Sequence, residues 1–355
     1  MYGDDARFCT RDGTRLAPQA SVAAAAAPPA AGALAPRGTA SRAGPPGPGP
    51  VTSFSNMAGR VLDGRYRIEK KIGEGGMSFV YLATDISDKK SYAIKVLSPS
   101  LSQDTNAMQR LRREAGLAIR LEHPNVCHII RLGETEDGLV YVVMPFVLGE
   151  ILADLRHKKG HIPLIQVAIW VTEMASGLHV AHELKIIHRD LKPENIMICK
   201  IDDGSEHAVV MDFGLAKERK AGGELEKLTA TGIILGTPEF MSPEQLRGKP
   251  LDPRTDIYSL ALMTYEMLTG KLPFTGRTQQ EMMIARLRNE PIPLRTMRPE
   301  LNFPPAVEKV LLKGMARAVD ERYATAPEFA AAFAGAATPE GDDKSGGVLG
   351  RLFGR

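Results

Sequence analysis

The spacing of apolar residues predicts two regions of different secondary structure. Between residues 66 and 147, short apolar stretches such as 91–96 are separated by Gly and Asp, a pattern typical of strands joined by turns. Further along, apolar positions from Val167 to Ala181 recur every three or four residues and predict an amphipathic helix. A second helix is predicted over residues 256–268.

The order of these regions indicates the fold class. A strand-rich lobe over residues 66–147 precedes a helix-rich lobe over residues 148–335, without the regular strand and helix alternation of a doubly wound sheet. We therefore expect an α+β fold with two lobes.

The two ends of the chain do not have the composition of a packed core. Residues 17–50 contain 13 Ala, 8 Pro and 5 Gly and no acidic or aromatic residue. Such a segment buries too little apolar area to offset the entropy of ordering it. We expect a disordered linker over residues 17–57 and a flexible tail over residues 336–355.

The charge balance does not indicate a nucleic-acid partner. Lys and Arg number 45 against 42 Asp and Glu, so the formal net charge is +3 and no strongly basic field exists. No apolar run is long enough for a membrane helix, and the first residues lack the pattern of a signal peptide. Three widely separated cysteines, Cys9, Cys127 and Cys199, argue against a disulfide framework. We expect a cytoplasmic protein.

A glycine-rich stretch between two predicted strands is a candidate phosphate-binding loop. In residues 72–80, glycines let backbone N–H groups approach phosphate oxygens, although a plain turn has the same pattern. Lys95 then lies in a predicted strand among apolar neighbours, so an inward-pointing ammonium needs an anion. Glu114 on the next predicted helix and a nucleotide phosphate are candidates. Without further motifs, a solvated surface pair would be the better interpretation.

Further motifs follow in a specific order. HRDLKPEN at 188–195 and DFG at 212–214 resemble the catalytic loop and metal-binding turn of bacterial eukaryotic-like (Hanks-type) protein kinases. The resemblance covers roughly residues 66–333, and it implies the two-lobed protein kinase fold with a strand-rich N-lobe and a helix-rich C-lobe. The later residues of the family pattern are Ser242, Pro243, Glu244, Asp256 and Arg322.

The resemblance implies phosphoryl transfer from Mg-ATP to a protein hydroxyl. By resemblance, Asp190 accepts the proton of the substrate hydroxyl, and Lys192 steadies the γ-phosphate. Asn195 and Asp212 offer the oxygen ligands that Mg²⁺ prefers. The expected cofactors are therefore ATP and Mg²⁺.

The resemblance also implies a nucleotide site. Lys95 would hold the α- and β-phosphates and be kept in place by Glu114. Adenine is expected between Val80 and Ala93 on one side and Met197 on the other, along residues 144–147. The full expected set is Ile72, Gly73, Gly75, Gly76, Ser78, Val80, Ala93, Lys95, Met144, Pro145, Val147, Glu194 and Met197.

Three positions depart from the family pattern. Ser78 stands where a third glycine is usual, and Ser242 where alanine is usual. Pro145 replaces a more usual acidic residue, but its C=O still accepts the adenine amino group and Val147 keeps an N–H donor. None of these changes is expected to abolish activity.

Other residues of the pattern are interpreted as structural. By resemblance, Asp256 caps the backbone of the catalytic loop and Arg322 pairs with Glu244. His188 is expected to pack beneath Phe213 rather than to act as a general base.

Three functional hypotheses are compatible with nucleotide binding. An active serine/threonine kinase is favoured, because Lys192 and the segment 236–239 resemble the Ser/Thr branch, in which Thr237 can bridge Asp190 and Lys192. A pseudokinase scaffold usually lacks the base, a metal ligand or the strand lysine, all of which are present here. A small-molecule phosphotransferase is disfavoured by the segment 242–244, which anchors a peptide-binding loop in the family.

Two threonines in the loop between Asp212 and Glu244 are candidate regulatory sites. Thr229 and Thr231 resemble the paired threonines of bacterial relatives, and Arg189 is a ready partner for a phosphate there. An ordinary polar loop is the alternative interpretation. We expect activation by autophosphorylation and protein substrates with Ser/Thr acceptors, and a homodimer through the strand-rich lobe remains open.

The region of Cys9, residues 1–16, resembles half of a zinc ribbon. Asp12 stands where a second cysteine is usual, and no upstream Cys-x-x-Cys exists. We therefore interpret residues 1–16 as a degenerate remnant or a disordered segment that holds no metal.

Overall fold

The computed structural model describes residues 57–75, 78–98, 105–201, 203–213 and 238–338. The expectations for residues 1–16, for most of the linker and for residues 339–355 lie outside these residues. The described residues belong to a single compact unit.

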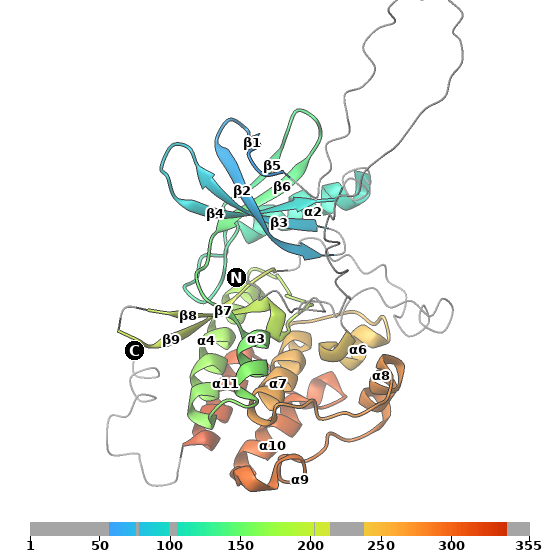
Figure 1. The fold of residues 1–355 in the computed structure, drawn as a ribbon. Coiled ribbons are helices and arrows are strands. Elements are labelled where there is room, and N and C mark those ends of the chain that lie inside the picture. Colours follow the sequence, from blue (N-terminus) through green and yellow to red (C-terminus); the bar gives the residue numbers. More distant parts are fainter. Residues whose placement is uncertain (1–56, 76–77, 99–104, 202, 214–237, 339–355) are drawn as a thin grey trace, which may run out of the picture. The chain divides into compact units, whose positions relative to one another are not determined.

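An antiparallel sheet forms the N-lobe, as the sequence predicts (Figure 1). Its strands lie in the order β1-β2-β3-β4-β6-β5, and their alternating apolar positions, including Ile68, Tyr81 and Ile94, are buried in one cluster. The strands are β1 (Val61–Leu62), β2 (Tyr66–Gly75), β3 (Ser78–Asp85), β4 (Ser91–Leu97), β5 (Arg131–Glu134) and β6 (Val140–Pro145).

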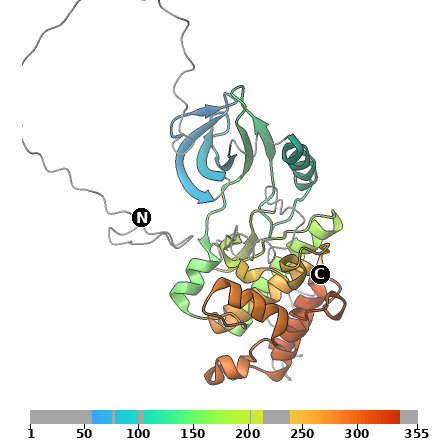
Figure 2. The same ribbon diagram turned by 90° about the vertical axis from the view of Figure 1, so that its right-hand side faces the viewer.

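One helix, α2 (Thr105–Ala118), lies beside this sheet (Figure 2). Met108 and Leu111 of α2 are buried together with Leu97 of β4 and Val140 of β6. This contact fixes the helix that carries Glu114 against the strand that carries Lys95.

The C-lobe is mainly helical and confirms both predicted helices, α4 and α7. It also contains a small sheet of order β7-β8-β9, and the expected site residues Asn195 and Asp212 lie just before β8 and just after β9. The helices are α3 (Leu152–Lys159), α4 (Leu164–Glu183), α6 (Pro243–Leu246), α7 (Arg254–Thr269), α8 (Gln279–Arg288), α9 (Leu294–Met297), α10 (Pro305–Gly314) and α11 (Ala326–Ala337), and the strands are β7 (Glu150–Ile151), β8 (Ile196–Lys200) and β9 (Glu206–Val210).

Helices α4 and α7 form the centre of the C-lobe. Trp170, Val171 and Leu178 of α4 are fully buried. Helix α7 ends at Gly270, whose φ of +74° and close approach to the Gly160 carbonyl leave no room for a Cβ. By length and composition α4 alone among the described helices could cross a membrane, but more than half of it is buried, as in the core helix of a folded domain.

The lobes extend slightly beyond the predicted boundaries. Met57, expected to belong to the linker, is buried in the N-lobe core, and Leu62 precedes the expected start at residue 66. Strand β1 pairs with β2, which accounts for this earlier start. At the other end α11 runs to Ala337, a buried residue inside the segment expected to be a tail.

Candidate active site

The β8–β9 hairpin brings the two halves of the catalytic motif together. Ile196 at the start of β8 is paired with Val210 at the end of β9, so the residues just before β8 lie beside those just after β9. The backbone N–H of Met211 donates to the Asn195 carbonyl at 2.8 Å. The hairpin register therefore places Asn195 next to Asp212, although 17 positions separate them in the chain.

Asp190 is oriented by its own loop. Asn195 Nδ2 donates to both the backbone carbonyl of Asp190 at 2.8 Å and its Oδ2 at 3.0 Å. Lys192 Nζ lies 3.7 Å from Asp190 Oδ2. The loop thus holds the carboxylate of the expected base beside an ammonium and an amide.

Asp256 on α7 caps the backbone that carries Asp190, as the resemblance implies. Its carboxylate accepts from the N–H of His188 at 2.8 Å and of Arg189 at 3.0 Å, and it lies 2.8 Å from His182 Nε2. Complete burial would raise the pKa of Asp256, but the hydrogen bond from His182 and the charges around it lower that pKa overall. Asp256 is therefore a charged acceptor inside the lobe.

His188 links the catalytic loop to the metal-binding turn. Its Nδ1 accepts from the N–H of Asp190 at 3.3 Å, so its Nε2 carries the proton and donates to the Met211 carbonyl at 2.8 Å. The ring packs edge-on against Phe213 with centroids 4.8 Å apart, which confirms the expected packing. Both ring nitrogens are used structurally, so His188 is not placed as a proton acceptor.

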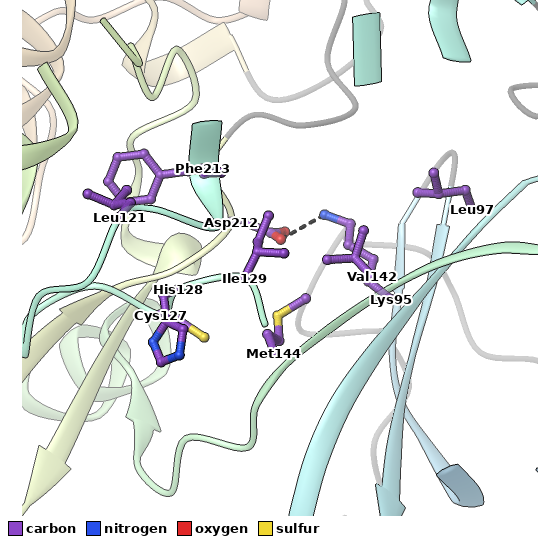
Figure 3. A pocket seen from close by; sticks show the side chains of 11 residues that line it. Lys95, Leu97, Leu121, Cys127, His128, Ile129, Val142, Met144, Asp212 and Phe213 are labelled. Atoms are coloured by element: carbon purple, nitrogen blue, oxygen red, sulfur yellow. Dashed lines mark hydrogen bonds and ion pairs between the residues drawn. The ribbon is translucent and has the colours of Figure 1, made fainter. Parts of the chain in front are cut away.

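The pairing of Lys95 differs from the expectation. Lys95 Nζ lies 2.7 Å from Asp212 Oδ1, as the dashed line in Figure 3 marks, while Glu114 Oε1 lies 3.7 Å from Arg189 Nη1. The structure thus brings Lys95 together with the expected metal ligand and places Glu114 beside the arginine of the catalytic loop. Lys95 and Asp212 neutralise each other in this arrangement.

The residues expected around adenine lie in one apolar cluster. Ala93 and Met144 are paired across strands β4 and β6 and are buried together, with Val80, Val147 and Met197 packed against them. Residues from both lobes therefore converge on the linking segment after β6.

Cys127 is a contact of this cluster that the motifs do not reveal. Its Sγ lies 3.8 Å from the Pro145 carbonyl, and burial raises the pKa of the thiol to about 12. The thiol therefore stays protonated and can donate weakly to that carbonyl, which has a second lone pair for another donor.

The remaining expected nucleotide residues lie along the glycine-rich hairpin and the catalytic loop. Ile72, Gly73 and Gly75 belong to β2, and Ser78 begins β3 opposite Gly75. Glu194 lies in the short 3₁₀ turn Pro193–Asn195. Gly76, Thr229, Thr231 and Thr237 lie outside the described residues.

The segment that begins at residue 238 is connected to both the core and the catalytic loop. Arg322 forms a bidentate pair with Glu244, with Nη1–Oε1 at 2.7 Å and Nη2–Oε2 at 2.8 Å, as the resemblance implies. Gln245 Nε2 donates to the Arg189 carbonyl at 2.7 Å. The peptide backbone next to Asp190 is therefore connected directly to this segment.

The buried ionisable residues Glu266 and Arg286 belong to no motif that the sequence analysis singled out. Glu266 on α7 lies 3.4 Å from Arg156 Nε, and Arg286 on α8 is almost completely buried. A charged residue at an inward-facing position of an amphipathic helix pattern is the only signal in the sequence that could have indicated them.

Comparison with known proteins identifies the family. The protein kinase domain family matches residues 66–330, so this chain belongs to that family. Its motifs and its relatives further place it with the bacterial Hanks-type serine/threonine kinases.

Curated relatives support the same assignment. Serine/threonine-protein kinase pkn3 of Myxococcus xanthus is 37% identical over 273 residues, which cover 77% of this chain and 50% of that protein. Serine/threonine-protein kinase PknB of Mycolicibacterium smegmatis is also 37% identical over 273 residues, which cover 76% of this chain and 42% of that protein. The chain thus spans about half the length, or less, of these relatives.

Solved structures share the fold. The crystal structure of the Mycobacterium tuberculosis PknI kinase domain superimposes with a TM-score of 0.61 at 26% identity, covering 79% of this chain and 98% of that one. Rad53 1–466 in complex with AMP-PNP has a TM-score of 0.62 at 22% identity, covering 75% of this chain and 64% of that one. The second similarity supports the two-lobed fold alone.

Proposed function

We propose that this chain transfers the γ-phosphoryl group of Mg-ATP to Ser and Thr hydroxyls of protein substrates. The observation that carries the proposal is the joining of Asp190, Lys192 and Asn195 to Asp212 and Lys95 at the end of one hairpin. These groups match the parts that phosphoryl transfer needs, namely positioning of the nucleophile and neutralisation of phosphate charge.

Asn195 and Asp212 would hold Mg²⁺. Since Asn195 Nδ2 is bonded to Asp190, its Oδ1 is the amide atom left for a cation, and Asp212 supplies a carboxylate. Such a set fits Mg²⁺, which is usually held by one or two protein oxygens together with phosphates and water. The bound ion would neutralise phosphate charge during transfer.

The protein's own groups then divide the remaining work. Asp190 accepts the hydroxyl proton of the substrate, and the neighbouring Lys192 ammonium attracts the transferring phosphoryl group. Lys95 exchanges its contact with Asp212 for a contact with the nucleotide phosphates. The apolar cluster of Ala93, Met144 and Met197 takes the adenine ring.

Phosphosite mapping tests the activity directly. The purified chain with Mg-ATP is expected to label itself and a generic basic acceptor protein, whereas Asp190→Asn should lower the rate by about 10²–10⁴-fold, the usual contribution of general base catalysis. Lys95→Met should also be strongly impaired. Equal labelling by the wild type and Asp190→Asn would favour the pseudokinase scaffold.

The proposal includes regulation through Thr229 and Thr231. A phosphate on either threonine would add roughly two negative charges for Arg189 to pair with. In this structure Arg189 Nη1 lies 3.7 Å from Glu114 Oε1. Phosphate would compete with the Glu114 carboxylate for the guanidinium, and Glu114 could then turn toward Lys95. Autophosphorylation would in this way order the phosphate-binding groups.

A further inference from the structure

The short segment at residues 238–241 is held by side chains at every carbonyl. Arg286 Nη1 donates to the Pro238 carbonyl at 2.6 Å and to the Met241 carbonyl at 3.1 Å, and its Nη2 donates to the Glu239 carbonyl at 2.5 Å. Ser259 Oγ donates to the remaining carbonyl, that of Phe240, at 2.7 Å. Four consecutive carbonyls therefore accept hydrogen bonds from residues of α7 and α8.

Arg286 is an unusual residue for this position. It is only 1% exposed, and its guanidinium lies 5.8 Å from the centroid of the Phe274 ring. Burying a charge is costly unless hydrogen bonds compensate it, and an apolar residue would fill the same space at lower cost. The planar fork of donors is, however, well suited to several carbonyls at once, which no apolar residue could hold.

The held segment is connected to the catalytic loop. Ser242 begins α6 with a capping box formed with Gln245, and the Gln245 side chain also donates to the Arg189 carbonyl. Arg189 precedes Asp190 directly. A continuous series of hydrogen bonds thus runs from Arg286 on α8, through residues 238–245, to the backbone beside the catalytic carboxylate.

We propose that Arg286 is a positioning residue for the protein substrate, which fixes residues 238–241 relative to Asp190 so that an acceptor polypeptide is seated with its hydroxyl at the base. The inference rests on the proposed function, because it assigns this segment to the binding of the acceptor. Arg286 contacts none of the expected nucleotide residues in its hydrogen bonds. Substitution of Arg286 should therefore lower kcat/KM for the acceptor protein and leave KM for ATP nearly unchanged.

Steady-state kinetics of Arg286→Met with myelin basic protein as acceptor test the proposal. Since small misplacements of reacting groups are costly, kcat/KM for the acceptor should fall by at least about tenfold, while KM for ATP changes by less than about twofold. Arg286→Lys, which keeps the charge but loses the planar fork, should be intermediate. Ser259→Ala removes the bond to the Phe240 carbonyl and a longer one, at 3.4 Å, to the Thr255 carbonyl within α7. It should have a smaller effect of the same kind.

Arg317→Met is the matched control. Arg317 Nη1 also donates to backbone carbonyls, those of Arg288 at 2.9 Å and Asn289 at 3.2 Å where α8 ends, but not to the carbonyls of residues 238–241. This variant should keep the wild-type kcat/KM for the acceptor. Melting temperatures of all variants are measured alongside, and if Arg286→Met does not fold, Arg286→Lys and Ser259→Ala decide.

The results separate the two proposals. A wild-type chain that phosphorylates no acceptor contradicts the proposed function itself. An active wild type with an unchanged kcat/KM in Arg286→Met contradicts the positioning role. The positioning role is also contradicted if KM for ATP in Arg286→Met rises by the same factor by which kcat/KM for the acceptor falls. It is likewise contradicted if Arg317→Met lowers kcat/KM for the acceptor as much as Arg286→Met does.

Discussion

Residues close in sequence orient the Asp190 side chain, whereas a residue far away in sequence holds the backbone beside it. Asn195 and Lys192 lie within five residues of it, so the loop motif alone supplies these contacts. Asp256, 66 positions away, holds the N–H groups just before it. A motif therefore predicts the reactive group, and a distant buried carboxylate holds the backbone of the loop that carries it.

Glu266 is a residue whose burial gives a testable pH dependence. Burial raises its pKa from an ordinary 4.5 to about 7, with the nearby Arg156 opposing the rise and Glu194 and Glu239 adding to it. A carboxyl with a raised pKa in the folded state stabilises that state most below its unfolded pKa, and this stability is lost as pH rises from about 4.5 to about 7. The shift corresponds to roughly 3 kcal/mol.

Glu266→Gln should remove this slope. The free energy of unfolding, measured by urea titration from pH 4.5 to 8, should fall with pH in the wild type more steeply than in the variant. Glu122→Gln, at an exposed position, is the control and should follow the wild type. Parallel curves for the wild type and Glu266→Gln would show that Glu266 does not titrate in this window.

Among the α-helices that bear on the site, α6 is the shortest. It has only four residues, and its position depends on the pair between Glu244 and Arg322, both buried. Burial would raise the pKa of Glu244, but the Arg322 guanidinium lowers it overall. Such a pair holds an element whose own hydrogen bonds are too few to make it stable.

Glu244→Gln should destabilise the protein by about 3–5 kcal/mol, because it leaves the Arg322 charge buried without its partner. Denaturant unfolding at pH 7 measures this loss. Glu321→Gln, at an exposed position, should change stability by less than about 0.5 kcal/mol. A Glu244→Gln variant as stable as the wild type would mean that the pair does not anchor α6.

The lowered pKa of Glu244 also sets an acid limit. A carboxylate whose folded pKa is depressed stabilises the protein above its unfolded value of 4.5, and that stability is lost as pH falls through the folded pKa. Thermal melting should therefore show the wild type losing stability below about pH 4.5 more steeply than Glu244→Gln. Equal slopes for the two proteins in this range would contradict the assignment.

At the scale of the whole molecule, ion pairs between described residues join the two lobes. Lys95 of the N-lobe pairs with Asp212 of the C-lobe, and Glu114 of the N-lobe lies beside Arg189 of the C-lobe. In the proposed function, Lys95, Glu114 and Asp212 of these pairs have other roles. Activation is therefore expected to require an exchange of partners between the lobes.

Thr229→Ala/Thr231→Ala should lower the turnover of an exogenous protein substrate, since no phosphate would compete with Glu114 for Arg189. Phosphosite mapping should find phosphate at one of these threonines in the wild type and not in Asp190→Asn. The double variant should keep its melting temperature. Unchanged turnover in it would disprove the switch and leave the kinase activity in place.

Sequence patterns predicted much of this protein correctly. The strand and helix periods located β2, β4, α4 and α7, because apolar spacing follows directly from backbone geometry. The motifs indicated Asp190, Asn195 and Asp212, since the chemistry requires these residue types at fixed local spacings. The structure brings these residues together, and their catalytic roles stay predictions.

Other features depended on contacts between distant segments. Met57 is buried in the N-lobe core, Lys95 pairs with Asp212, and Arg286 donates hydrogen bonds to residues 238–241. No local pattern in the sequence relates the positions that these contacts join. A buried charge shows in the sequence only as a polar residue at an apolar position, and its partner is set by which helices and loops meet in three dimensions. The sequence by itself therefore determined which residue types form the candidate site. Which side chains pair with one another was decided by how distant segments pack in the tertiary structure.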